Sequence, residues 1–310
     1  MENGKHIKRK LKIFAGIVVY VRARMKKIWG LRHIVFMLMK KGKNIMPVIK
    51  DLEWTFDTVA STYEKFRPGY PNDLYKTLFE YIVLDGSSQV VEVGIGGGQA
   101  TLPILKTGCS LTAVEYGENF SKLCAKKFEE YNKFSVITEK FENISLPESQ
   151  YDLVYSASAF HWVPEDIGYS KVYAMLKPGG AFARFANHPY RDKDNPILSS
   201  EIDKLYSRYY YAYYGKDIKA ETEYSEEQAI QRAQIAEKYG FTDIRHGMFY
   251  RTRTFSAKEY TALLGTYSDH IAIEEKIRTA FFAHIEETIN RYGGTFTIYD
   301  TIDLQLARKP

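Results

Sequence analysis

The sequence predicts an α/β fold in which a mostly parallel sheet carries helices on both faces. Three observations predict it. Short apolar runs bounded by turn residues alternate with segments of helical periodicity along the middle of the chain. One of these runs passes through a glycine-rich turn into a helix. Two late segments alternate with period two, as strands do.

The elements follow in order along the chain. Val90, Val91 and Val93 form a short apolar run, typical of a strand buried on both faces. Pro178-Gly179-Gly180 ends the last predicted helix of this series, since that sequence does not continue a helix. The predicted strands are 89–93, 111–115, 134–138, 152–156 and 181–187, and the predicted helices are 72–83, 99–106, 118–131 and 167–176.

A cap interrupts this alternation in two places. Residues 190–228 contain six tyrosines between positions 206 and 214, and residues 256–292 hold two helical segments, 257–266 and 271–292. Between the two segments, a helix over 229–239 ends at Gly240. The alternating positions are Ile244, His246, Met248 and Tyr250 in one late strand, and Phe296, Ile298, Ile302, Leu304 and Leu306 in the other. We therefore expect residues 47–310 to form one domain with a helical cap.

Charge divides the 310 residues into two parts. Residues 1–50 hold 14 Lys/Arg and one acid, whereas residues 51–310 hold 29 Lys/Arg against 37 Asp/Glu. The acidic body argues against a nucleic-acid partner, because phosphate binding needs a basic face. Two cysteines are too few for a disulfide scaffold and fit a reducing compartment, so we expect a cytoplasmic protein.

The basic arm over residues 1–46 allows three interpretations. Apolar residues at helical spacing among lysines and arginines, over 8–29, are typical of an amphipathic helix on an anionic membrane surface. A signal peptide fits less well, because the apolar stretch 13–21 is short and no small-residue cleavage site follows. The third interpretation is a poorly packed extension, with the working protein beginning at Met46.

The glycine-rich turn is the strongest chemical signal. Residues 92–98 read EVGIGGG, and glycine lets the backbone adopt positive φ and lets a ligand approach closely. A dinucleotide-binding loop would need glycine at 99, where Gln99 stands. The next predicted strand ends at Glu115, whose carboxylate is suited to accept hydrogen bonds from both ribose hydroxyls of a nucleoside.

These motifs resemble class I S-adenosylmethionine-dependent methyltransferases. The resemblance rests on residues 92–98 with Glu115, on residues 56–71, on residues 151–163 (YDLVYSASAFHWV) and on residues 177–182 (KPGGAF). The resemblance covers about residues 54–310. Within the family, the sequence is similar to a small-molecule branch that includes trans-aconitate methyltransferase-like enzymes. The resemblance implies a Rossmann-like sheet of seven strands with an antiparallel last strand, and S-adenosyl-L-methionine as the cofactor.

The resemblance also implies a set of cofactor contacts. The loop glycines would approach the methionine and ribose portions, Glu115 would bind the ribose, and Tyr116 would cover the adenine. Phe141 and Glu142 would lie beside the adenine, and the N-terminal segment with Tyr63 and Arg67 would fold over the cofactor. The complete set is Glu92, Gly94, Gly96, Gly98, Glu115, Tyr116, Phe141, Glu142, Ser156, Ala157, Trp162, Tyr63 and Arg67.

The acceptor side is less defined. His161 follows the fourth predicted strand, where it is either a proton acceptor or a side chain that shapes the site. Tyr267 and His270 are candidates to line the acceptor pocket. The Asn/Asp-Pro-Pro-aromatic motif of nucleic-acid amino methyltransferases is absent after the fourth strand, which favours a small-molecule acceptor. The scattered histidines specify no metal site.

The predicted function is transfer of the methyl group of S-adenosylmethionine to an oxygen, a nitrogen or a carboxylate of a small molecule. The sequence leaves two alternatives open. One is a nicotinamide-dependent oxidoreductase. Gln99 and the two late strands argue against it. The other is a non-catalytic cofactor-binding scaffold at a membrane surface, in which the basic arm would be the working part.

Overall fold

The computed structural model describes residues 60–217 and 222–310. The basic arm, with its three interpretations, lies outside the described residues. The strands are β1 (Gln89–Val93), β2 (Ser110–Glu115), β3 (Phe134–Thr138), β4 (Tyr151–Ala157), β5 (Leu176–Tyr190), β6 (Thr242–Ser256) and β7 (Thr295–Arg308). The helices are α3 (Ala60–Phe66), α4 (Asn72–Tyr81), α5 (Thr101–Leu105), α6 (Glu118–Lys127), α7 (Glu165–Met175), α8 (Pro196–Leu205), α9 (Ala212–Tyr214), α10 (Glu226–Gln234), α11 (Ala257–Leu264), α12 (Ser268–Ile271) and α13 (Glu275–Arg291). Short 3₁₀ turns are η1 (Phe160–Trp162) and η3 (Ile235–Tyr239), and η2 (Tyr206–Tyr211) is a π-helix.

The strands form one sheet in the order β3-β2-β1-β4-β5-β7-β6, seven strands within the described residues. β1 to β5 pair in parallel, whereas β7 runs antiparallel to both of its neighbours, β5 and β6. The predicted fold class is confirmed: a mostly parallel, Rossmann-like sheet with an antiparallel last strand. The parallel strands place their carboxyl ends at one edge, where ligands bind in open α/β sheets.

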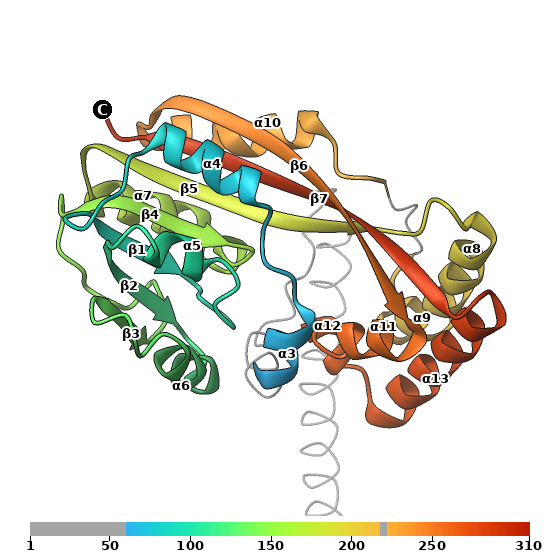
Figure 1. Ribbon diagram of the computed structural model, residues 1–310. Helices are drawn as coiled ribbons and strands as arrows, with labels where there is room; N and C mark the ends of the chain where they lie inside the picture. The colour runs from blue at the N-terminus through green and yellow to red at the C-terminus, as the bar shows by residue number, and fades with distance from the viewer. Residues whose placement is uncertain (1–59, 218–221) are drawn as a thin grey trace, which may run out of the picture. The chain divides into compact units, whose positions relative to one another are not determined.

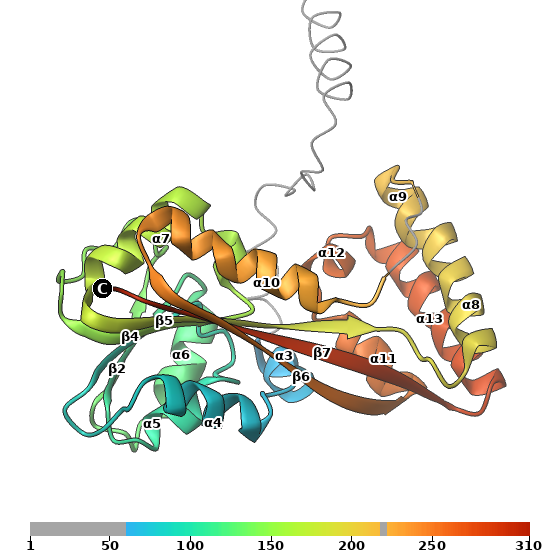
Figure 2. The same cartoon turned by 90° about the horizontal axis from the view of Figure 1, so that it is seen from above.

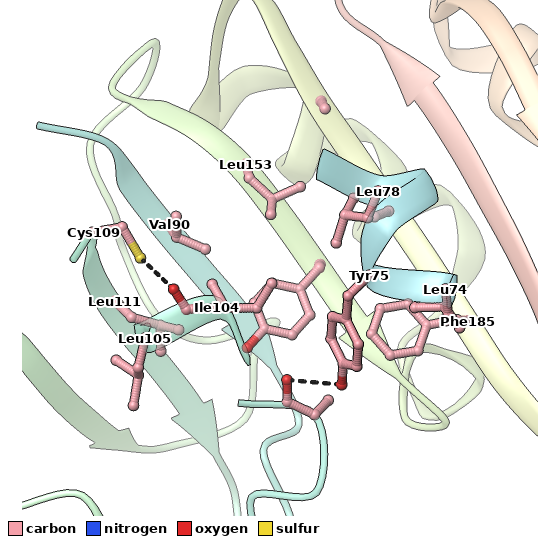
Figure 3. Packing of buried hydrophobic residues seen from close by; sticks show 14 of the residues in the cluster. Leu74, Tyr75, Leu78, Val90, Ile104, Leu105, Cys109, Leu111, Leu153 and Phe185 are labelled. Carbon is pink, nitrogen blue, oxygen red and sulfur yellow. Dashed lines mark hydrogen bonds between the residues drawn. The ribbon is translucent and has the colours of Figure 1, made fainter. Parts of the chain in front are cut away.

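Helices cover both faces of this sheet (Figure 2). On one face, α4, α5 and α6 pack on a core that includes Leu78, Ile104 and Cys124. Figure 3 shows α4 laying Leu74, Tyr75 and Leu78 against Leu153 and Phe185, with the Tyr75 hydroxyl donating to the carbonyl of Ala100 at 3.2 Å. On the other face, α7 and η3 pack on a second core with β1, β4 and β5, and α10 lies over β6 and β7.

The cap sits on the far ends of the long strands β5, β6 and β7 (Figure 1). It has a core of its own, built from α8, α11, α13 and the first residues of β7, with Phe281, Ile285 and Ile289 buried. Ser256 and Glu259 form a capping box that starts α11, and Ser225 and Gln228 do the same for α10. The long strands therefore join the cap directly to the part of the sheet that carries the glycine-rich turn.

Several boundaries differ from the predicted ones. β5 begins before and ends after the predicted 181–187. At its start Leu176 pairs with Tyr151 of β4, and at its end residues 188–190 pair with β7 along the ribbon that carries the cap. The predicted helix 271–292 is divided into α12 and α13. Along β6 the predicted alternation holds as far as Met248, but Tyr250 is 69% exposed because beyond that point the inward positions lie on the other face, at Arg251 and Arg253.

Candidate active site

The loop between β1 and α5 forms a tight backbone turn at the carboxyl edge of the sheet. Gly94, Gly96 and Gly98 have φ of +75°, +52° and +73°, a region that side chains other than glycine rarely adopt. A Cβ on Gly94 would lie 2.3 Å from the Cβ of Ala159, which follows β4. Glycine at 94 therefore lets the loop approach the end of β4 at a distance that no other residue permits.

Glu92 lies beneath this loop and is completely buried. Its Oε2 accepts hydrogen bonds from Thr101 Oγ1 at 2.8 Å and from the Tyr155 hydroxyl at 2.6 Å. Its Oε1 is buried and has no hydrogen-bond partner among the described residues. Burial raises the pKa of Glu92 to about 7, partly offset by the bonds from Tyr155 and Thr101. The orphaned oxygen fits a ligand that brings a donor or a positive charge to the loop.

Glu115 ends β2 and faces the same loop. Its Oε2 accepts from the backbone N–H of Gly96 and its Oε1 from the N–H of Gly117, both at 2.9 Å. These two bonds fix the plane of the carboxylate at the sheet edge. A carboxylate offers about four acceptor positions, so this orientation fits the recognition of a ribose diol.

The segment after β3 is held in place by Lys171 of α7. Its ammonium donates to the carbonyls of Phe141 at 2.6 Å, Glu142 at 3.2 Å and Ile144. The Phe141 side chain is buried in the core beneath α7, and Glu142 is half-buried. On the β2 side, the Lys140 ammonium lies 4.6 Å from the centre of the Tyr116 ring. The residues predicted around the adenine are therefore brought to one edge, with Phe141 facing the core.

The end of β4 is joined to both neighbouring strands and to the N-terminal segment. Ser156 is buried and its hydroxyl donates to Val93 O at 2.7 Å, so it ties β4 to β1. Ser158 has a φ of +55°, and its Oγ lies 2.9 Å from the Tyr70 hydroxyl. Strained backbone at a strand end is a frequent feature of functional sites. Sequence reasoning missed Ser158 and Tyr70, and the two closely spaced serines in SAS were the available signal.

His161 and Trp162 follow in η1, with ring centres 4.9 Å apart. The His161 ring is exposed, yet the surrounding protein atoms desolvate its cationic form. That desolvation, together with the positive charges of Arg232 and Arg184, lowers the pKa of His161. His161 is therefore neutral at pH 7 and able to accept a hydrogen bond or a proton.

Helix α3 crosses the glycine loop. The Tyr63 ring lies 3.7 Å from where a Cβ on Gly96 would stand. The Glu64 carboxylate pairs with Lys127, which also donates to the carbonyl of Gly97. Arg67 donates through Nε to Thr266 Oγ1 at 3.0 Å and stacks on Tyr267 with its guanidinium carbon 3.9 Å from the ring centre. The segment predicted to fold over the cofactor thus spans from the loop to the cap.

The two predicted acceptor-site residues, Tyr267 and His270, lie in different surroundings. Tyr267 is half-buried against Arg67, beside the segment that covers the loop. His270 is buried within the cap, where its Nε2 lies 3.0 Å from the Tyr206 hydroxyl and its Nδ1 2.9 Å from Asp269. His270 is therefore part of the cap's internal hydrogen-bond network, together with much of the tyrosine run.

The chain is similar in sequence to known methyltransferases. Residues 91–183 match the Methyltransferase domain family, and this span contains the last three residues of β1, the glycine loop, Glu115 and the β4 motif. An uncharacterized methyltransferase-like protein of Schizosaccharomyces pombe is 25% identical over 83% of this chain and 96% of its own length. The protein is an S-adenosylmethionine-dependent methyltransferase.

Two further relatives of this methyltransferase are informative. The malonyl-acyl-carrier-protein O-methyltransferase 1 of Ilyobacter polytropus is 25% identical over 51% of this chain and 61% of its own length. The solved structure of a proposed type II methyltransferase from Anaeromyxobacter dehalogenans matches with a TM-score of 0.55 at 20% identity. It covers 78% of this chain and 98% of that one, which supports the fold. The match of residues 91–183 to the Methyltransferase domain family sets the nicotinamide alternative aside.

Two features are absent from the described part of the chain. None of its helices is long and apolar enough to cross a membrane. Within the same residues, no group of three or more His, Cys, Asp or Glu side chains is placed to hold a metal ion.

Proposed function

We propose that this enzyme methylates a small-molecule acceptor bound between the glycine loop and the helical cap. The observation that carries the proposal is the cap itself, which is built on the same strands as the reacting edge and joined to the loop through α3. A site enclosed in this way suits a compact acceptor. The 37 acidic against 29 basic residues of the body oppose a nucleic-acid acceptor.

S-adenosylmethionine, when bound, supplies a methyl group already activated by its sulfonium. The chain's own residues then have three tasks: to bind, to orient and to exclude water. Glu115 and the glycine loop hold the ribose side, and Glu92 attracts the positively charged methionine end. Alignment of two reactants accounts for about 7–11 kcal/mol in well-oriented systems, so positioning can supply a large share of the rate.

His161 is the proposed proton acceptor when the acceptor atom is a hydroxyl or an amine. Its low pKa keeps it unprotonated at pH 7, and a general base contributes about 10²–10⁴-fold. A carboxylate acceptor needs no base. One curated relative carries the name of an O-methyltransferase, which supports an oxygen acceptor without identifying it.

The cofactor assignment is tested by thermal stability of the full chain with S-adenosylmethionine, S-adenosylhomocysteine, NADH and NADPH in parallel. A ligand at a hundred times its Kd adds about 2.7 kcal/mol to the folded state. We expect a rise of several degrees with the two adenosyl compounds alone. Glu115→Ala should remove it, because two charge-assisted hydrogen bonds are lost, at about 1.5–3 kcal/mol each.

An acceptor screen then follows, with formation of S-adenosylhomocysteine as the readout. Small-molecule carboxylates, phenols and amines form one arm, and transfer RNA and duplex DNA form the other. Turnover confined to the nucleic-acid arm would contradict a small-molecule acceptor. Within a productive arm, His161→Gln separates the two roles of His161: a hydroxyl or amine acceptor should lose about 10²-fold or more in kcat, at the low end of what a general base supplies.

A further inference from the structure

A polar cluster lies on the α10-covered face of the sheet, just beyond the end of β4. Arg184 of β5 stands in register with Ser156 of β4 on one side and with Gln305 of β7 on the other. Because side chains alternate along a strand, His188 of β5 and Asp303 of β7 lie on the same face as Arg184. The His188 Nε2 is 3.0 Å from Asp303 Oδ1.

Arg232 of α10 covers this cluster. Its Nη1 lies 3.5 Å from His188 Nε2 and 3.9 Å from Asp303 Oδ2. The guanidinium carbon of Arg184 lies 5.0 Å from the centre of the Phe160 ring, next to His161 in η1, and Arg232 contacts His188 four residues further along β5 from Arg184. The two guanidiniums, here called the arginine pair, therefore occupy one neighbourhood beside the His161 turn.

The cluster has more positive than negative charge. Asp303 is its carboxylate, completely buried, and already accepts from the Tyr224 hydroxyl at 3.0 Å and from Gln305 Nε2, besides its contact with His188. Arg184 makes one hydrogen bond among the described residues, to the neutral hydroxyl of Tyr169. A guanidinium carries five N–H donors. Burial of a cation without a matching anion is costly, and burial lowers the pKa of Arg184 accordingly.

The side chain of Gln305 gives a second indication that the cluster is incomplete. Gln305 is 5% exposed, and its Oε1 is buried without a hydrogen-bond partner in the described part of the chain. The amide nitrogen of the same side chain is occupied by Asp303. Buried polar atoms are normally satisfied. The orphaned oxygen, directly across the ladder from Arg184, indicates that a polar group is still to be added here.

We infer that the arginine pair binds an anionic group of the methyl acceptor, a carboxylate or a phosphate, and so anchors the acceptor beside His161. This inference rests on the proposed function and names its substrate class. Guanidinium groups match the oxygens of both anions with two parallel hydrogen bonds. The Oε1 of Gln305 then accepts from a hydroxyl or a protonated oxygen of the same ligand.

The anchored anion is not the atom that is methylated. Pairing with two guanidiniums withdraws electron density from an oxyanion and makes it a weaker nucleophile. The acceptor therefore carries at least two polar groups, one held by the arginine pair and one presented to the methyl donor. Binding of the anion also offsets the positive charge around His161, which restores the basicity of that ring as the acceptor enters.

The test uses the full chain saturated with S-adenosylhomocysteine. Inorganic phosphate and succinate are titrated separately by calorimetry at constant ionic strength, which distinguishes a phosphate anchor from a carboxylate anchor. We expect saturable binding of at least one of them. Arg184→Gln and Arg232→Gln should each weaken it about tenfold or more, as loss of a charged hydrogen-bond donor does. Arg291→Gln, an exposed arginine paired with Glu287 on α13, is the matched control and should bind as wild type.

Two readouts separate this inference from the proposed function. S-adenosylhomocysteine should bind all four proteins with equal affinity, which also shows that the variants are folded, and Arg232, 29% exposed, is the position less prone to misfolding. Equal anion binding by wild type and both variants, or none at all, would overturn the anchor and leave the methyltransferase assignment intact. Failure of wild type to bind S-adenosylhomocysteine would overturn both. Nuclear magnetic resonance should show the pKa of His161 rising when the anion binds.

Discussion

The carboxyl group of Glu92 is buried beneath the glycine loop, with one oxygen doubly hydrogen bonded and the other bonded to nothing in the described structure. Burial raises its pKa to about 7, whereas the unfolded chain would titrate near the ordinary glutamate value of about 4.3. Between these values the folded protein binds a proton that the unfolded chain has released. Stability contributed by Glu92 is therefore fully present below the lower pKa and is lost as pH rises to about 7.

Glu92→Gln should remove this pH dependence. Glutamine keeps the shape of the side chain and stays neutral. Between about pH 5 and 7 the free energy of unfolding of the wild type should fall by up to about 1.4 kcal/mol per pH unit because of Glu92, and this contribution should be absent from the variant. Urea denaturation of both proteins at several pH values across and just above this range measures it. A constant difference between the two proteins across this range would show that Glu92 titrates normally.

Gly94 and Gly179 provide a matched pair for the glycine loop. Both have positive φ, +75° and +79°, but a Cβ on Gly94 would meet Ala159 whereas a Cβ on Gly179 would meet nothing within 4 Å. Gly179→Ala should cost about 1–2 kcal/mol, the cost of the left-handed backbone alone. Gly94→Ala should cost about 1–3 kcal/mol more, from overpacking, and should weaken S-adenosylhomocysteine binding. If denaturation shows the same loss of unfolding free energy for both variants, the loop moves away from Ala159 at no measurable cost.

At the scale of elements, the ribbon of β5, β6 and β7 is held together by a second buried carboxylate. Asp300 of β7 accepts from Arg251 and Arg253 of β6, with Arg253 Nη2 at 2.9 Å from Oδ1, and from Asn187 of β5 at 2.9 Å. Arg251 also donates to the carbonyl of Gly69 at 2.8 Å, in the segment that leads from α3 to α4. The network therefore joins all three long strands to the N-terminal segment.

Asp300→Asn should destabilise the protein by about 3–5 kcal/mol, because it leaves two largely buried guanidiniums without their counter-charge. Asp243→Asn is the control, since its carboxylate pairs with Arg245 at the surface, where such pairs contribute about 0–1 kcal/mol. The comparison is made by urea denaturation at constant pH. A loss below about 1 kcal/mol at position 300, no more than a surface pair contributes, would show that the arginines find other partners or water.

Local signals predicted the elements of the cofactor-binding half well. β3 begins and ends at the predicted residues, and β1 does the same, because each is a short apolar run between turns. The cap was less predictable. The tyrosine run forms a π-helix within a longer helical segment, and its packing against α12 and α13 depends on contacts with residues more than 50 positions away.

The site divides in the same way. Glu115 and the glycines belong to compact motifs, each contained in a strand end and the turn that follows it, so local pattern is enough to single them out. Arg184 and Asp303 gave no such signal, because they lie on different strands 119 positions apart and only the pairing of β5 with β7 brings them to one face. The pairing register of strands that are far apart in the chain cannot be predicted from the local pattern of a single sequence.

At the scale of the whole molecule, the domain division at residue 46 stays a prediction, and it has a direct test. We expect removal of residues 1–45 to leave S-adenosylhomocysteine affinity within about twofold, because every residue of the cofactor motifs follows Met46. Co-sedimentation with anionic vesicles should be lost if residues 8–29 form a membrane-surface helix. Loss of cofactor affinity on truncation would show instead that the arm completes the site.

The long strands have one more consequence for this enzyme. A cap joined by a loop can swing as a rigid lid, but this one grows out of β5, β6 and β7 themselves (Figure 1). The hydrogen-bonded ladder of β7 is continuous with β5 from Ala181 to Tyr190 and with β6 from Arg245 to Ser256. Opening by a hinge would require breaking that ladder. For the proposed acceptor site between the glycine loop and the cap, we therefore expect entry by small displacements of the helices at the strand ends. Those helices can also be exchanged in evolution for others, so that a new acceptor is accommodated while the chemistry at the carboxyl ends of β1 and β4 is kept.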